Sequence, residues 1–139
     1  MKIHYWPLLI LLFLEMGCHT RIVKHDLKLL AGYWRIDFIT KKKETFHPKG
    51  MTKLLDYYAL KKNNGVRKKV EPLINNNFQI TEDQNPFTIV YKGKDCFMQF
   101  ETQWDQWREK IIRLKESELV LEHQEKRYHY VRFIKDSEL

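Results

Sequence analysis

The residue types that most often carry chemistry are sparse in this sequence, and few are spaced to act together. His123 and His129 flank the segment HQEKRYH, which reads as a hairpin. Opposed residues of a hairpin lie about 5 Å apart, so the two imidazoles could bind a metal with Glu122 or Glu125. The alternative is a pair of half-exposed strand histidines, and we expect no metal site and no cofactor.

Acid–base and nucleophilic chemistry find no better support. Glu101, Asp105 and Glu109 are too spread along the chain to propose as a carboxylate pair. Cys96 reads as a small buried apolar residue rather than a reactive thiol. The chain has no Gly-x-Ser-x-Gly elbow, no His-Glu-x-x-His pair and no glycine-rich phosphate loop. The sequence therefore predicts no catalytic residues and a protein that is not an enzyme.

The first part of the chain carries an apolar run, Leu8–Leu14, behind Lys2. A helix needs about 20 apolar residues to cross a bilayer, so this run is too short to span one. A basic start, a short apolar middle and a small residue at the cut are typical of a secretory signal peptide. A buried strand is the alternative.

The segment LLILLFLEMGC resembles the lipobox of bacterial lipoproteins, in which a Leu-rich run ends in a small residue and a cysteine. Gly17 and Cys18 fit the last two positions, while Glu15 stands where an aliphatic residue is usual. The resemblance implies that residues 1–17 are a signal peptide and that Cys18 is lipidated, which would anchor the protein to a membrane of the cell envelope. The HTR that follows lacks an acidic run, and by this resemblance it favours a periplasm-facing location.

The formal net charge is +7. The basic residues are scattered as KKK, KKNNGVRKK and singles rather than gathered on one helix, so we do not expect nucleic acid as a partner. The simplest reading is a solvated surface. Anionic lipid heads, polysaccharide or an acidic protein are the other partners that a basic surface would suit.

Residues 18–28 read as a tether, and residues 29–139 read as one domain. Apolar and polar residues alternate with period two, which predicts strands. Trp34, Ile36 and Phe38 share one face of their strand, as do Cys96, Met98 and Phe100 of another. The Asn64–Gly65 pair predicts a tight hairpin turn. Strands are expected over residues 32–40, 52–61, 65–71, 77–82, 86–92, 95–103, 108–115, 118–125 and 127–134.

This pattern predicts an all-β fold of eight or nine antiparallel strands in up-and-down order. Closing such a sheet removes its exposed edges, so we expect a β-barrel. A barrel of about eight strands has an interior that side chains fill or that holds one small ligand.

Gly32-Tyr33-Trp34, in LLAGYWRI, resembles the Gly-x-Trp element that opens the first strand of lipocalins. The stretch WREKIIRLKESELVLEHQEKRYHYVRF resembles the closing strands of small bacterial lipocalin-like lipoproteins, and the likeness covers Leu29–Lys135. It implies a lipocalin-like barrel with a small-molecule cavity, in which Trp34 closes one end beneath Arg132. Other lipocalin motifs are absent, so the ligands of the animal proteins are not carried over.

Two functions are compatible with this reading. In the first, a small apolar or amphipathic ligand binds inside the barrel, against the aromatic side chains listed below. These aromatics could instead simply fill the core. In the second, the barrel exterior serves an envelope protein partner, with Tyr33, Tyr57 and Trp107 as anchors. The residues expected to line the ligand site are Phe38, Tyr58, Phe78, Phe87, Phe100 and Tyr130.

Overall fold

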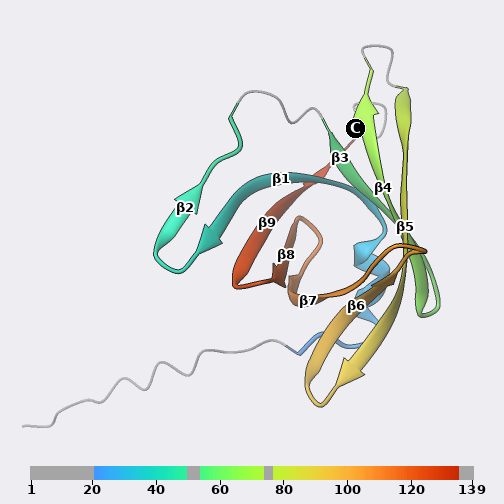
Figure 1. The fold of residues 1–139 in the computed structure, drawn as a ribbon, viewed down its shortest axis with the longest axis vertical. Coiled ribbons are helices and arrows are strands. Elements are labelled where there is room, and N and C mark those ends of the chain that lie inside the picture. The colour runs from blue at the N-terminus through green and yellow to red at the C-terminus, as the bar shows by residue number, and fades with distance from the viewer. Residues whose placement is uncertain (1–20, 50–53, 74–76, 135–139) are drawn as a thin grey trace, which may run out of the picture.

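The computed structural model describes residues 21–49, 54–73 and 77–134. In chain order they form a short 3₁₀ helix followed by one antiparallel sheet (Figure 1). The helix is η1 (Asp26–Leu30), and the strands are β1 (Gly32–Lys41), β2 (Glu44–Phe46), β3 (Leu55–Lys61), β4 (Asn64–Pro72), β5 (Phe78–Lys92), β6 (Asp95–Glu101), β7 (Gln106–Leu114), β8 (Glu118–His123) and β9 (Lys126–Phe133).

The sheet closes on itself. Its strands follow the order β2-β1-β3-β4-β5-β6-β7-β8-β9, and β1 also pairs with β9 along most of its length. Eight strands, β1 and β3 to β9, therefore form an up-and-down barrel, while β2 extends β1 outside it. The predicted all-β antiparallel barrel is confirmed, and residues 106–114 form a strand rather than a long helix.

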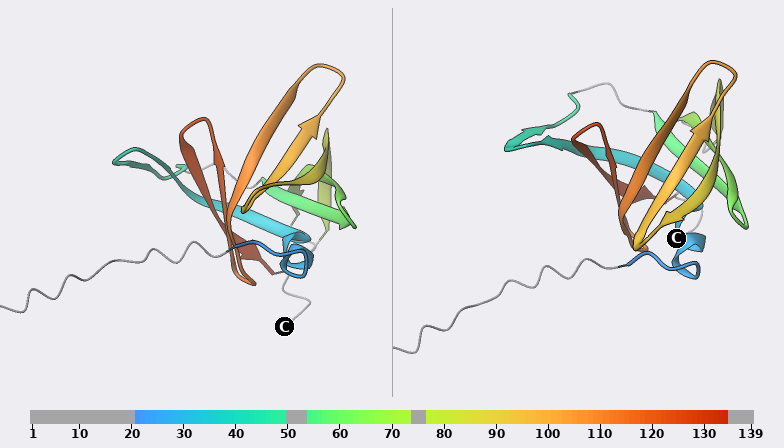
Figure 2. Two further views of the ribbon diagram at one scale, coloured as in Figure 1. Left: turned by 90° about the horizontal axis from the view of Figure 1, so that it is seen from below. Right: turned by 60° about the horizontal axis from the view of Figure 1, so that its bottom comes forward.

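The two ends of the barrel differ. At one end, which we call the closed end, Ile22, Leu27 and Leu30 pack into the core against Trp34. Residues 22–28 are thus part of the domain, although the sequence placed them in a tether. In the right view of Figure 2, η1 and the β3–β4 and β5–β6 turns lie together at this end. The opposite end, the mouth, carries the β1–β2, β6–β7 and β8–β9 turns.

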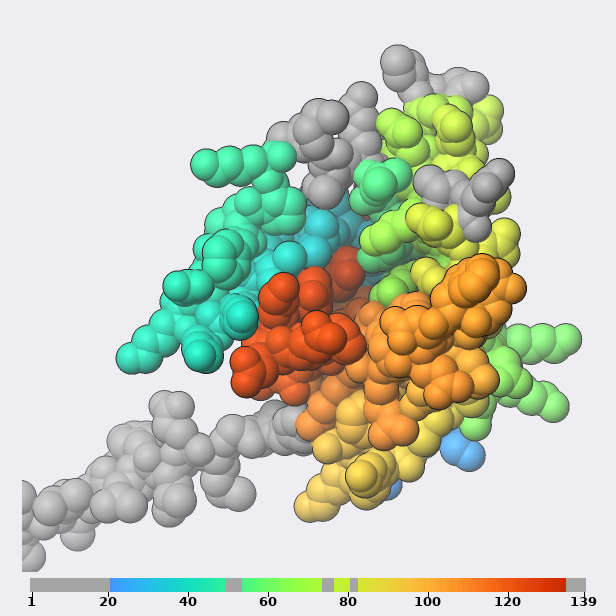
Figure 3. All heavy atoms as spheres, in the orientation of Figure 1, coloured from blue at the N-terminus to red at the C-terminus, as the bar shows by residue number. Residues whose placement is uncertain are grey.

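The hairpin of β1 and β2 projects beyond the barrel, as the space-filling view shows (Figure 3). Only Gly32, Tyr33 and Trp34 of β1 pair with β3, and nearer the mouth Ile39, Thr40 and Lys41 pair with β2 instead. The sequence did not predict β2, whose three residues are all exposed.

Two predicted strands, 77–82 and 86–92, are one continuous strand, β5. The run EDQNP, Glu82–Pro86, reads as a turn between the two predicted strands. Pairing of β5 with β6 begins only at Phe87, so Pro86 lies where β5 has an edge on that side. An edge strand tolerates proline, because no ladder hydrogen bond is lost there.

The turn expected at Asn64–Gly65 falls two residues earlier, at Lys62 and Asn63, and Lys62 has a φ of 57°. Gly65 serves a different purpose, because it pairs with Phe87 and lies beneath its ring. A Cβ at position 65 would lie 2.3 Å from Phe87 Cζ. Only glycine leaves room for this ring, which belongs to the core.

The predicted signal peptide and lipidated Cys18 lie outside the described residues. Among residues 21–49, 54–73 and 77–134, no helix is long and apolar enough to cross a membrane.

Candidate functional site

The closed end is sealed by Trp34 and Arg132. The Arg132 guanidinium lies over the indole, 4.1 Å from the ring centroid, and Trp34 Nε1 donates a hydrogen bond to the Leu30 carbonyl at 2.9 Å. Gly32 permits this contact, since it has a φ of 117° and a Cβ there would lie 2.8 Å from Arg132 Nη1. A ligand has no access to the interior from this end.

The core above this seal is filled with aromatic and aliphatic side chains. Tyr58, Phe87, Phe100 and Tyr130, all predicted to line the ligand site, are buried in it. Phe87 contacts both Tyr58 and Phe100, with ring centroids 6.1 and 5.3 Å apart. Of these four side chains, Tyr130 alone also lines the polar cavity described next, and together they form a packed core rather than the wall of a large apolar cavity.

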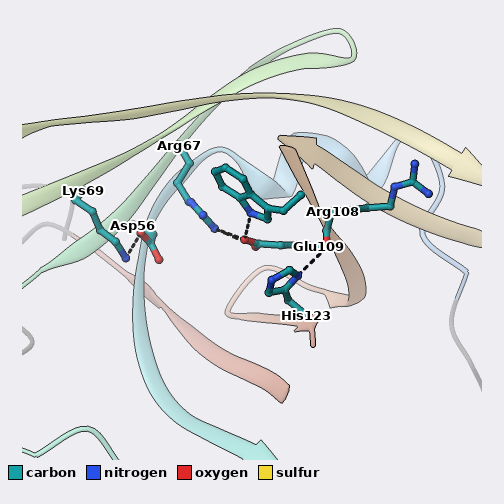
Figure 4. Close-up of polar contacts among 7 residues, drawn as sticks. Asp56, Arg67, Lys69, Arg108, Glu109 and His123 are labelled. Atoms are coloured by element: carbon teal, nitrogen blue, oxygen red, sulfur yellow. Dashed lines mark hydrogen bonds and ion pairs between the residues drawn. The ribbon is translucent and has the colours of Figure 1, made fainter. Parts of the chain in front are cut away.

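A polar cavity of about 220 Å³ lies towards the mouth. Four of its residues are charged (Figure 4). Asp56 comes from β3, Arg67 and Lys69 come from β4, and Glu109 comes from β7. The cavity is lined by Asp56, Arg67, Lys69, Glu109, His123, Tyr128 and Tyr130. The sequence predicted an apolar interior, and the structure shows that this holds for the core but not for the cavity.

An ion pair crosses the cavity from β4 to β7. Arg67 Nη1 donates to both carboxylate oxygens of Glu109, at 3.0 and 2.9 Å, and Trp107 Nε1 donates to Glu109 Oε1 at 2.9 Å. The Arg67 guanidinium also lies 4.4 Å from the Phe100 ring centroid, and Trp107 stacks on the same ring. Trp107 is therefore an inward-facing residue and not the exterior anchor that the sequence predicted.

A second ion pair lies beside the first. Lys69 Nζ is 2.6 Å from Asp56 Oδ1, and the Asp56 side chain is 3 % exposed. His123 completes this side of the cavity, with Nδ1 3.0 Å from the Arg108 carbonyl oxygen. All four formal charges of the cavity are thus paired within the protein.

The tyrosines of the cavity remain protonated. Burial raises the pKa of Tyr58, Tyr128 and Tyr130 above the ordinary value of 10.0. Burial lowers the pKa of Arg67, but Tyr58 and Glu109 raise it more, and the guanidinium stays charged. Among the described residues, the buried Arg67 Nε has no hydrogen-bond partner, and because Arg67 lines the cavity, this N–H is a donor that a polar ligand would meet.

A second cavity, of about 350 Å³, continues along the inner face of the projecting hairpin. It is lined by Ile39, Lys41, Glu44, Phe46 and Lys126. Ile39 pairs directly with Tyr128, which lines the polar cavity. The two cavities are therefore neighbours across one β1–β9 residue pair.

Two of the predicted site residues face away from the interior. The register of β1 shifts between Ile36 and Phe38, and this β-bulge moves Phe38 to the outer face, where it stacks on His129 at 4.1 Å. Phe78 stacks on Tyr33 at 4.3 Å, and Tyr33 contacts Tyr57 at 4.7 Å. Phe78 thus belongs to an outer aromatic cluster with the two tyrosines that the sequence placed outside.

The two histidines considered as metal ligands do not meet. His123 pairs with Lys126 and faces the cavity, whereas His129 pairs with Val120 and faces outwards. No group of three metal-ligating side chains was found in the part of the chain that the structure describes.

These features define a class of protein: a closed up-and-down barrel of eight strands, sealed by a Trp–Arg pair between its first and last strands, with a polar cavity towards the mouth. The fold is lipocalin-like. Barrels of this size, lipocalins among them, hold one small ligand or fill their interior with side chains.

Solved structures with a similar fold come from bacteria and from an animal. They include a lipocalin-like protein from Bacteroides uniformis (14% identity, TM-score 0.45, covering 76% of this chain and 99% of that one). A protein from Bacteroides eggerthii has 7% identity and a TM-score of 0.47, covering 75% and 99% of the two chains. Lobster apocrustacyanin A1 has 11% identity and a TM-score of 0.41, covering 80% and 66%. No protein-family pattern and no curated protein sequence matches the chain.

Proposed function

We propose that this protein binds a small amphipathic molecule at the mouth of the barrel and has no catalytic role. The single observation that carries the proposal is the Ile39–Tyr128 pair, which places the polar cavity beside the cavity along the hairpin. A polar cavity of about 220 Å³ is small for a drug-sized ligand, which fills about 300–1,000 Å³. It suits a head group, and Ile39 and Phe46 offer apolar surface to the remainder of the molecule.

The charges of the polar cavity indicate what kind of head group fits. Arg67 pairs with Glu109, and Lys69 pairs with Asp56. A ligand with a net charge would have to compete with one of these pairs. Separating the buried Arg67–Glu109 pair costs about 3–5 kcal/mol. We therefore favour a head group without net charge, zwitterionic or rich in hydroxyls, that bonds to the tyrosine hydroxyls.

The test uses dodecylphosphocholine, a zwitterionic single-chain amphiphile, added below its micelle concentration to the full chain. Binding is followed by isothermal titration calorimetry. Tyr128→Phe removes one hydroxyl from the polar cavity and is expected to weaken binding about three- to tenfold. Its control is Tyr57→Phe, which removes a hydroxyl from the outer face.

The hairpin cavity is tested in the same way. Phe46 is 50% exposed, so Phe46→Ser is expected to weaken binding without unfolding the barrel. Ile134→Ser, at a residue of 52% exposure, is the matched control. Equal affinities for all four variants, or no binding of the unsubstituted protein, would contradict the proposal.

The second candidate function is a protein-binding exterior. The outer cluster of Tyr33, Tyr57 and Phe78, with Phe133 6.3 Å from Phe78, supports it, because clustered aromatics are favoured at interface centres. Binding of the amphiphile with the variant pattern given above favours the cavity over this alternative.

We also propose that the protein is a lipoprotein of the cell envelope, anchored through Cys18 and facing the periplasm. The support is the resemblance of LLILLFLEMGC to a lipobox. Mass spectrometry of the protein from host membranes should show a chain that begins at Cys18 and carries a diacylglycerol. An intact residue 1–17 segment would contradict this.

A further inference from the structure

The closed end of the barrel carries a concentration of exposed basic side chains. They come from the segment around η1 and from the three turns β3–β4, β5–β6 and β7–β8, which all lie at this end. The exposed residues are Arg21, Lys24, Lys28, Lys61, Lys62, Lys92, Lys94 and Lys115. We call this set the basic end.

Acidic neighbours offset little of this charge. Asp95 is paired with Lys110 at 2.9 Å and lies opposite Lys92 across the β5–β6 turn, so it offsets part of the charge there, whereas Glu118 is paired with Arg113 at 2.9 Å. Among the described residues of this end, Asp26 and Glu116 are the remaining carboxylates. The basic end is thus strongly positive.

The mouth has no comparable surplus. Its turns and strand ends expose Lys42, Lys43, Lys49, Arg108 and Arg127, of which Arg127 is paired with Glu122, and they also expose carboxylates. The exposed acidic residues there are Glu44, Glu101, Asp105 and Glu125. Among the described residues, the excess of exposed positive charge is therefore larger at the basic end than at the mouth.

We propose that the basic end rests on an anionic lipid surface and that the mouth points away from it. The basic groups are mostly lysines on separate turns, which suits a diffuse negative surface better than one small anion held by converging donors. The first described residue, Arg21, also lies at this end. Because three residues span at most about 11 Å, a lipid anchor at the proposed position, three residues before Arg21, would lie near the basic end.

The proposed direction of the mouth, away from the membrane, rests in part on the proposed anchor at Cys18. The proposed attraction of the basic end to anionic lipid does not depend on that anchor. An anchor within about 11 Å of Arg21 would hold the lysines near the lipid head groups. Their separation would be comparable to the Debye length of about 8–10 Å, so salt would not fully screen the attraction. The ligand-binding mouth would then open into the aqueous phase.

The experiment uses the full chain with Cys18→Ser, so that no lipid can be attached, and measures co-sedimentation with vesicles. One vesicle preparation is pure phosphatidylcholine, and the other contains phosphatidylglycerol at about a third of its lipid. The apolar run Leu8–Leu14 contributes to both, so the difference between the two preparations reports the charge. We expect tighter binding to the anionic vesicles, with the difference falling as salt is raised.

Two double variants locate the surface. Lys62→Gln with Lys94→Gln removes two charges from the basic end, and Lys42→Gln with Lys43→Gln removes two from the mouth. Lys62 and Lys42 have nearly equal φ values of 57° and 55°, so the backbone strain is matched. One basic residue near an anionic membrane contributes about fivefold to binding, so the first variant should lose about 25-fold and the second little.

Trp104, in the β6–β7 turn at the mouth, is 86% exposed and provides the competing orientation. Trp104→Ala should leave anionic vesicle binding unchanged. A loss caused by Trp104→Ala, an equal loss in both lysine variants, or equal binding to the two vesicle types would overturn the proposal. Binding to heparin without binding to the anionic vesicles would also overturn the proposal. Because Cys18→Ser is present throughout, these outcomes are independent of whether Cys18 is lipidated.

Discussion

The Arg132 side chain lies over the Trp34 ring and ties the first and last strands of the barrel to the N-terminal helix. Besides its contact of 4.1 Å with the indole centroid, Arg132 donates hydrogen bonds to the carbonyl oxygens of Leu29, Ala31 and Glu116. A single side chain thus satisfies three backbone acceptors at the point where the sheet closes.

Removing the Arg132 charge should loosen the closed end. Arg132→Met keeps an apolar stem over Trp34 but loses the cation–π contact and the three hydrogen bonds. We expect a loss of about 1–3 kcal/mol in the free energy of unfolding, measured with urea. Arg127→Met is the control, because Arg127 makes a surface pair with Glu122 that contributes less than about 1 kcal/mol. Equal losses for the two variants would contradict the role given to Arg132.

The contact between Gly65 and Phe87 predicts a size-dependent effect. Gly65→Ala places a methyl group where the Phe87 ring lies, so it should destabilise the barrel by about 1–3 kcal/mol. In a Phe87→Leu background the same change should cost less, since the ring is gone. A double-mutant cycle from thermal or urea unfolding measures this coupling, and additive effects would show that the ring does not restrict position 65.

Removing one partner of the buried Arg67–Glu109 pair should lower the free energy of unfolding more than replacing both partners with apolar residues. Glu109→Leu leaves the Arg67 guanidinium unpaired and should cost about 3–5 kcal/mol of unfolding free energy. The double variant Arg67→Met with Glu109→Leu should recover most of that loss, because no buried charge remains. A double variant as unstable as the sum of the Arg67→Met and Glu109→Leu single variants would show that the two side chains are not coupled, and would contradict the prediction.

His129 predicts a pH dependence of stability. Burial lowers its pKa from the ordinary 6.5, so the unfolded chain binds a proton there more readily than the folded protein does. His129 therefore favours the folded state above about pH 6.5, and this contribution is lost as the pH falls. The unfolding free energy should drop between pH 7 and pH 5, and His129→Gln should reduce the drop.

The matched control for His129→Gln is His25→Gln, since the His25 side chain is 78% exposed. That variant should keep the pH dependence of the unsubstituted protein. A pH profile unchanged by His129→Gln would assign the effect to other groups.

Alternation alone predicted most of the barrel. Cys96, Met98 and Phe100 share a buried face as expected, because β6 has no irregularity in the described pairing. Phe38 shows the limit, since the bulge in β1 inserts one residue and reverses the faces that follow it. Nothing in the local sequence marks that insertion, which is defined by the pairing of β1 with β9.

The charged residues of the polar cavity were not predicted, although the sequence carries a signal for them. Asp56 stands two residues before the buried Tyr58, and Glu109 stands between Trp107 and Ile111 on the same alternating face. A carboxylate within an apolar stripe predicts a buried partner of opposite charge. The identity of that partner, Arg67 for Glu109, depends on strands 42 residues apart and requires the fold.

Closure through β1 and β9 also sets the order in which the chain can fold. The contact between Arg132 and Ala31 joins residues 101 positions apart, so the cylinder cannot be completed before nearly the whole chain has left the ribosome. Folds dominated by such distant pairings form slowly, in milliseconds to seconds. Until then the inner faces of β6 to β8 stay uncovered, and such exposed apolar surface is prone to aggregation.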